Sequence, residues 1–131
     1  MNLKTIRLEL ARDGDHPSGD FEHGYIFRAP LDAHGHFDRF RWAAVNQLCT
    51  VHRLEKGHEV EHGLLILNRR GQWVFSYAQG DEDDETLFRL NDHQFRPGEY
   101  ISITEHDGVQ RTFKVASVAD WHPVSASAVA L

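Results

Sequence analysis

Apolar and polar residues alternate along most of this chain, which is the pattern of β-strands that bury one face. The segment 95–118 is the clearest case. It has turn signals at 97–98 and 106–108, an apolar and β-branched run at 100–103, and regular alternation at 113–118. The sequence therefore predicts that residues 95–118 fold as a β-hairpin.

The same alternation, interrupted by turn-forming residues, predicts further strands. Trp73, Phe75 and Tyr77, for example, fall on one face of a strand. The polar run 80–85 is expected to cross solvent as a hairpin tip. In addition to the hairpin, we expect strands near residues 3–11, 25–27, 49–54, 64–68, 72–77 and 87–90.

One helix is predicted over about 38–48, where Asp38 is placed to cap the first turn. Apolar side chains recur there at three- and four-residue spacing, namely Phe37, Phe40, Ala44 and Leu48. The expected fold is mainly β, either a small antiparallel barrel or a two-layer β meander with this one short helix. Because so short a helix cannot cover a large open sheet, we expect the sheet to curl and the helix to cap one end.

Composition and charge narrow the class of protein. Of the 131 residues, 40% are hydrophobic and 26% are charged, which is typical of one globular domain. We expect a β-rich domain over 1–119 and a C-terminal tail over 120–131 that frays or adds an edge strand. The formal net charge of -6 argues against a nucleic-acid partner, which needs a surplus of Lys and Arg on one face.

Location and assembly are also expectations from the sequence. No apolar run is long enough to span a bilayer, so no membrane partner is expected. The single cysteine, Cys49, cannot form an intramolecular disulfide, which favours a cytoplasmic location. Beside Leu48 and Val51 it is predicted to be a small buried hydrophobe. A homodimer through an edge strand is expected if the sheet does not close, and the sequence leaves the choice between a small-molecule and a protein partner open.

Three Glu-His pairs, Glu22-His23, Glu61-His62 and Glu105-His106, are predicted to stand at strand ends or turns. Strand ends of a barrel can gather at one rim. There His23, His62 and His106 would bind zinc or a similar divalent metal, and the glutamates would orient them. In the other interpretation, the histidines and glycines are turn residues and the glutamates are solvated rim charges.

The segment 58–62 matches the H-E-x-x-H signature of zinc metalloproteases. That chemistry needs both histidines on one face of a helix. Glycines bracket the segment and a strand-like run follows at 64–67, so no helix, and hence no metalloprotease, is expected. In an extended strand the two histidines would lie on one side and the two glutamates on the other.

Two resemblances bear on function. Pro97-Gly98-Glu99-Tyr100 and Arg111-Thr112-Phe113-Lys114 resemble part of the flavin-binding barrel of the ferredoxin-reductase family, in which a P-G-Q-Y strand precedes an R-x-Y-[S/T] strand that holds the flavin. Here Phe113 lacks the phenol of that pattern and Lys114 replaces its hydroxyl residue. The segments RLELAR, EHGYIF, PGEYISITEHDG and RTFKVASV make the whole chain similar to a family of short uncharacterised bacterial proteins, which implies a free-standing domain and no known activity.

The leading interpretation is a non-catalytic binding or assembly module. Trp42, Trp73 and Trp121 are candidates to line a pocket or a partner surface, although core packing is the commoner role of such residues. The first alternative is a divalent-metal-binding protein or metal-dependent enzyme that uses the Glu-His pairs. The second alternative is a flavin-binding barrel.

Overall fold

The computed structural model describes residues 3–77 and 83–122. Alternating apolar residues form strands over most of this length, as the sequence predicts. The elements, in chain order, are β1 (Leu3–Leu10), β2 (Asp20–Pro30), α1 (Arg39–Val45), the 3-10 turn η1 (Asn46–Leu48), β3 (Thr50–Glu55), β4 (His58–Leu67), β5 (Trp73–Tyr77), β6 (Glu85–Leu87), the 3-10 turn η3 (Leu90–Asp92), β7 (Tyr100–Thr104) and β8 (Gln110–Asp120).

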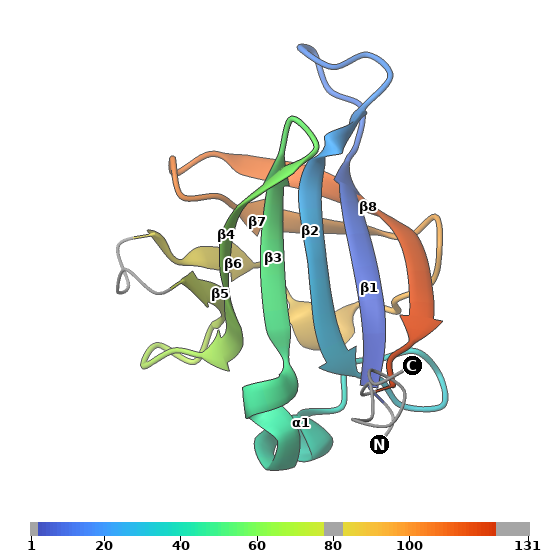
Figure 1. The fold of residues 1–131 in the computed structure, drawn as a ribbon, viewed down its shortest axis with the longest axis vertical. Helices are drawn as coiled ribbons and strands as arrows, with labels where there is room; N and C mark the ends of the chain where they lie inside the picture. Colours follow the sequence, from blue (N-terminus) through green and yellow to red (C-terminus); the bar gives the residue numbers. More distant parts are fainter. Residues whose placement is uncertain (1–2, 78–82, 123–131) are drawn as a thin grey trace, which may run out of the picture.

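The strands form a closed antiparallel barrel in which each strand pairs with its neighbours in sequence and β1 pairs with β8 (Figure 1). The predicted barrel is therefore confirmed. Closure also removes the edge strand of an open sheet on which the expected homodimer depended, since every strand of the described barrel pairs on both sides. The homodimer stays a prediction.

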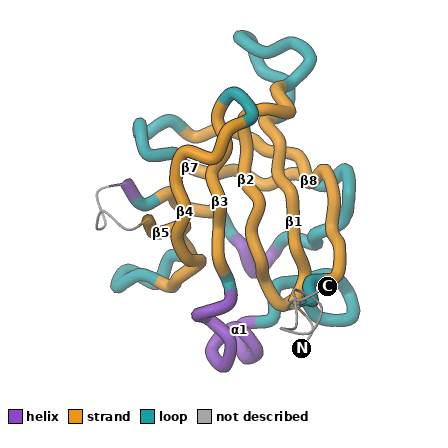
Figure 2. The backbone as a smooth tube through the Cα atoms, in the orientation of Figure 1, coloured by secondary structure: helices purple, strands orange, loops and turns teal. Residues whose placement is uncertain are grey.

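Helical segments close one end of the barrel, as Figure 2 shows for α1. Trp42 of α1 packs edge-on against Trp73 of β5, with 4.7 Å between ring centroids, and its indole N–H donates to the Leu65 carbonyl at 3.0 Å. Trp121, after β8, lies under the Arg28 guanidinium at 4.4 Å. Trp73 belongs to the core, and Trp42 and Trp121 are partly buried and pack against it.

The predicted apolar face of the helix is wrong at Phe40 and Ala44, which are exposed. Asp38 is the N-cap, as expected, and accepts from the Arg41 N–H at 3.1 Å, so the helix begins only at Arg39. Phe37 therefore precedes the helix and is buried, whereas Phe40 is 93% exposed. Leu48 packs against the core as predicted, together with Trp42 and Val45 of this segment.

Two further expectations concern the burial of Cys49 and of Glu85. Cys49 is buried, and burial raises the pKa of its thiol to about 11, so the expected small hydrophobe is confirmed. Glu85, by contrast, was expected in a solvated hairpin tip and is completely buried in β6. Residues 78–82, which hold the first half of that run, lie outside the described residues, as do residues 123–131 of the predicted tail.

Candidate functional site

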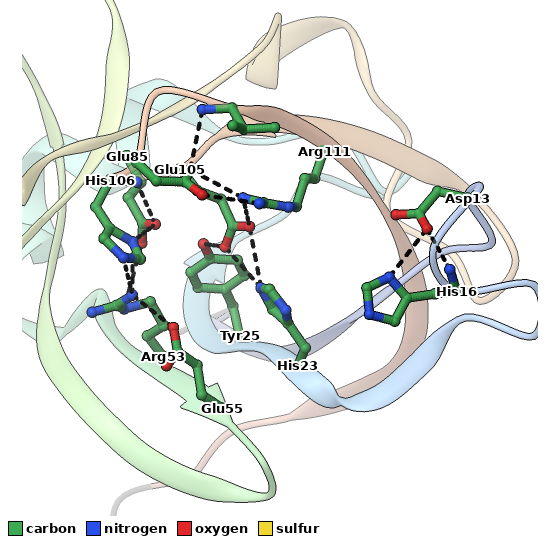
Figure 3. Close-up of polar contacts among 12 residues, drawn as sticks. Asp13, His16, His23, Tyr25, Arg53, Glu55, Glu85, Glu105, His106 and Arg111 are labelled. Carbon is green, nitrogen blue, oxygen red and sulfur yellow. Dashed lines mark hydrogen bonds and ion pairs between the residues drawn. The ribbon is translucent and has the colours of Figure 1, made fainter.

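The open end of the barrel carries a cluster of polar side chains that continue the inward-facing apolar positions of the strands. In an up-and-down barrel, alternate residues of each strand face inward. These positions run from Phe27 to Tyr25 and His23 on β2, Val51 to Arg53 on β3, Phe75 to Tyr77 on β5, Leu87 to Glu85 on β6, Ile103 to Glu105 after β7, and Phe113 to Arg111 on β8. We call the polar members of this set, together with His106, the mouth network; Figure 3 labels all of them except Tyr77.

Glu105 anchors one half of the mouth network. Its side chain is 1% exposed and accepts from the Tyr25 hydroxyl at 2.5 Å, from the Arg111 guanidinium at 2.9 Å and from the His23 Nε2 at 3.0 Å. Burial alone would raise the pKa of this carboxyl, but the three donors outweigh burial and hold the pKa below its usual value. The carboxylate is thus fixed in its charged form.

The partners of Glu105 respond to its charge. Hydrogen bonding to this carboxylate raises the pKa of His23 above its ordinary value, although burial opposes the shift. Burial, together with the neighbouring carboxylates, raises the pKa of the Tyr25 hydroxyl. Arg111 also binds Asp107 through both oxygens, at 2.9 and 3.0 Å, and this lowers the pKa of Asp107 to about 2. This half of the network is therefore an ion-paired unit.

Glu85 anchors the other half with the same types of partner. Its side chain is fully buried and accepts from the Tyr77 hydroxyl at 2.6 Å, and from the backbone N–H of His106 at 3.0 Å. The His106 Nδ1 lies 3.1 Å from the same carboxylate, and the Arg53 Nε lies 3.9 Å from it. Each buried glutamate thus has a tyrosine, a histidine and an arginine beside it, although the Arg53 Nε makes no hydrogen bond.

The two histidines differ in what faces them. His23 faces a carboxylate, whereas the Arg53 Nη1 lies 2.7 and 3.2 Å from the two ring nitrogens of His106. An arginine can only donate, so a ring nitrogen of His106 must accept this bond. Arg53 itself is 9% exposed and also donates to Glu55 at 3.1 Å. The two halves of the network therefore contain the same residue types, but the hydrogen bonds of their histidines differ.

A cavity of about 300 Å³ opens beside the network, lined by Asp20, His23, Glu55, Lys56, Glu105, His106, Asp107 and Arg111. Every lining carboxylate accepts a hydrogen bond from within the chain. Among the described residues that line the cavity, the ammonium of exposed Lys56 makes no hydrogen bond, and the Nδ1 of His23 can donate when the ring is protonated, because Nε2 bonds Glu105. The cavity can therefore offer hydrogen-bond donors to a ligand.

The three predicted metal ligands are not brought together. His23 and His106 both line the mouth cavity, but His62 is exposed on β4 and neighbours His52, with 6.3 Å between ring centroids. Within residues 3–77 and 83–122, no group of three or more His, Cys, Asp or Glu side chains is arranged to hold a metal ion. Zinc binding stays a prediction that this geometry does not favour.

The placement predicted for the Glu-His pairs is partly wrong. Glu105-His106 follows β7 at a turn, but His23 and His62 lie inside β2 and β4. The glycines after them are not turn residues: a Cβ at Gly24 or at Gly63 would lie 1.9 Å from a carbonyl oxygen of the neighbouring strand. Glycine is required at these two positions by the close approach of two strands.

The face predicted for the 58–62 segment is also wrong. It is a strand, as expected, but the register moves from Arg53–Glu61 to Leu54–Glu59 and leaves Val60 as a bulge. Glu59 therefore contacts His52, while Glu61 lies 4.0 Å from Arg53. The bulge separates the two glutamates that plain alternation would place on one side.

The positions that resemble a flavin-binding barrel have other partners here. Arg111 is bound to Glu105 and Asp107, and Phe113 is fully buried against Tyr25, with 5.2 Å between ring centroids. Tyr100 is 53% exposed on the strand before them. The flavin alternative stays a prediction that these contacts do not favour.

Comparisons with known proteins add no family. The chain matches no protein-family model, no curated protein and no solved structure. Among the residues described, none of the helices is both long and apolar enough to cross a membrane.

Proposed function

We propose that this chain is a non-catalytic binding module that takes a small ligand rich in oxygen acceptors at the mouth of its barrel. One observation carries the proposal: a cavity beside the buried Glu105 presents the ammonium of Lys56 and the Nδ1 of His23, while each of its carboxylates already accepts a bond within the chain. Small-molecule sites are commonly cavities with a few convergent polar groups, and barrel mouths are a frequent location for them.

Hydrogen-bond capacity and charge point to different ligands, and we give hydrogen bonding more weight. The carboxylates that line the cavity outnumber its permanent cations, so charge alone would favour a cationic ligand. Two of those carboxylates, Glu105 and Asp107, are however already bound by Arg111, so a cation would have to compete with that guanidinium. Breaking the bond to Glu105, whose side chain is 1% exposed, costs about 1.5 to 3 kcal/mol. An acceptor can instead bind Lys56 and protonated His23 without breaking any bond.

The absence of catalysis in this proposal rests on the pKa directions. General acid–base groups work best with a pKa near the operating pH. The pKa of Glu105 is lowered and those of Tyr25 and Tyr77 are raised, so each moves away from neutrality. His23 is the exception, because its pKa rises from an ordinary value just below neutrality, and we assign it to positioning a bound group because Glu105 holds its ring.

The test is a titration followed by NMR of backbone and histidine side-chain signals, with acetate, acetamide and methylguanidinium as probes. We expect acetate and acetamide to shift the signals of His23 and Lys56, and methylguanidinium to leave them unchanged. Lys56→Met should abolish the shifts, whereas the matched exposed lysine variant, Lys114→Met, should retain them. Shifts with methylguanidinium alone, or equal loss in both lysine variants, would contradict the proposal.

A further inference from the structure

A second hollowed surface lies on the outside of β4, β5 and β6, towards the end that α1 closes. It consists of two adjoining hollows of about 730 and about 380 Å³, which share Leu67, Gln72 and Thr86. Arg69 and Arg70 line the first hollow, and Arg39 and Arg89 line the second. We call the two hollows together the arginine groove.

The arginine groove gathers four of the arginines that have no ion pair with another described residue. No carboxylate of the described residues forms an ion pair with Arg39, Arg69, Arg70 or Arg89, and all four are exposed. Most other arginines are engaged: Arg7, Arg41, Arg53, Arg96 and Arg111 pair with carboxylates, and Arg28 stacks on Trp121. The net charge of the chain is -6, whereas the four arginines give the groove a local excess of positive charge.

The groove also offers apolar contact. Ile66 and Leu67 are half-buried in its wall, and Phe88 is 51% exposed at its rim. The Arg89 guanidinium lies 5.0 Å from the centre of the Phe88 ring. Exposed aromatic side chains and arginines are enriched where proteins bind other proteins.

Arg89 keeps its place at a conformational cost. Its φ is 52°, in the left-handed region that a non-glycine residue occupies only at about 1 kcal/mol or more. Glycine or asparagine would adopt this conformation more cheaply. Strained residues of this kind often mark functional surfaces. The backbone conformation of Arg89 is therefore an observation, separate from its charge, that supports a functional role for the groove.

We propose that the arginine groove binds an acidic segment of a partner protein, in which carboxylates alternate with apolar residues. The carboxylates would pair with the four arginines, and the apolar residues would contact Leu67 and Phe88. A nucleic acid fits less well, because it needs a basic face that the chain's net charge and the groove's own Asp84 and Asp92 oppose.

The probe is a fluorescein-labelled peptide of about ten residues, glutamates interleaved with leucines, which is long enough when extended to span both hollows. Its binding is followed by fluorescence anisotropy at an ionic strength of about 0.15 M. We expect saturable binding that a lysine-for-glutamate peptide does not show. The double variant Arg69→Gln/Arg70→Gln should weaken it about tenfold, the effect of losing two exposed ion pairs.

Arg12→Gln is the matched control, because Arg12 is an exposed arginine outside the groove that also has no ion pair in the described part of the chain. It should change binding by less than about twofold. Equal weakening by Arg12→Gln, no saturable binding of the peptide, or tighter binding of an oligouridine through the same arginines would overturn the proposal. Folding of each variant is checked by circular dichroism, and Lys56→Met should leave peptide binding intact, which separates this site from the mouth cavity.

Discussion

The mouth network and the arginine groove use the same kinds of charged side chain in opposite ways. At the mouth, Arg53 and Arg111 are each bound to carboxylates, and the glutamates beneath them are buried. At the groove, the arginines face solvent without a carboxylate partner in the described residues. Pairing and burial fix the geometry of the mouth, whereas the groove keeps its charges available. A ligand at the mouth would therefore bind donors that the network leaves free, whereas a ligand at the groove would bind entire arginine side chains.

The two regions share one feature. Lys56 at the mouth and Arg89 at the groove are the two non-glycine residues with positive φ in the described chain, both at 52°. Lys56 precedes Gly57 in the tight turn between β3 and β4, where asparagine is the usual choice. A cation thus occupies a strained backbone position at each candidate site.

The largest expected effect comes from removing a buried charge at the mouth. Glu85→Gln leaves Arg53, which is 9% exposed, without its most buried partner. Breaking a buried ion pair on one side costs about 3 kcal/mol or more. Urea unfolding followed by tryptophan fluorescence should show this loss in the free energy of unfolding.

The groove supplies the matched comparison. Arg69→Gln/Arg70→Gln removes two charges that have no partner in the described chain, so the free energy of unfolding should change by less than about 0.5 kcal/mol. If the two variants were equally destabilised, the distinction between a structural mouth and an available groove would be lost.

The mouth network could have been found from sequence by carrying one rule further. The alternation that predicts Ile101 and Ile103 on one face of a strand also places Glu105 on that face, and Phe113 likewise leads to Arg111. Strand alternation predicts the face of a residue. It does not predict which strand ends meet, because that depends on barrel closure and on the order of the strands.

Other features had no local signal. Val60 forms a bulge because of how β3 and β4 pair, and a bulge reverses the face of every residue beyond it. Glu85 follows four acidic residues in sequence, and composition alone favours solvent for such a run. Its burial depends on contacts with Tyr77 and Arg53, which are neither acidic nor part of that run. Local pattern was sufficient for the fold class and insufficient for the partners of the buried charges.

A smaller effect is expected from the titration of His23. Its pKa is raised, so the bond to Glu105 contributes fully below about pH 6.5, the ordinary histidine value, and is lost as pH rises through the folded-state pKa. Arg111 and Glu55 also face this ring with opposite effects on it. The lowered pKa of Glu105 preserves the same bond down to below its ordinary value of 4.5.

We therefore expect the wild-type protein to lose about 1 to 2 kcal/mol of stability through this bond above neutral pH, the scale of a hydrogen bond to a charged group. Urea unfolding between about pH 5 and pH 9 measures it. His23→Gln should flatten the dependence, while His34→Gln, at an exposed histidine, should retain it. A slope that is unchanged in His23→Gln would assign the pH dependence to other groups.

The smallest expected effect concerns the two strained cations, and its sign is positive. Lys56→Asn and Arg89→Asn should each raise the free energy of unfolding by about 0.5 to 1 kcal/mol, because asparagine adopts a left-handed backbone at lower cost. Lys56→Asn should also remove the response to acetate at the mouth and leave peptide binding unchanged. Arg89→Asn should leave the response to acetate unchanged and weaken peptide binding about threefold, the effect of losing one exposed ion pair. Thermal unfolding and the two binding assays together test this. A variant that gains stability and keeps its own binding would show that the cation at that position is not held there for a ligand.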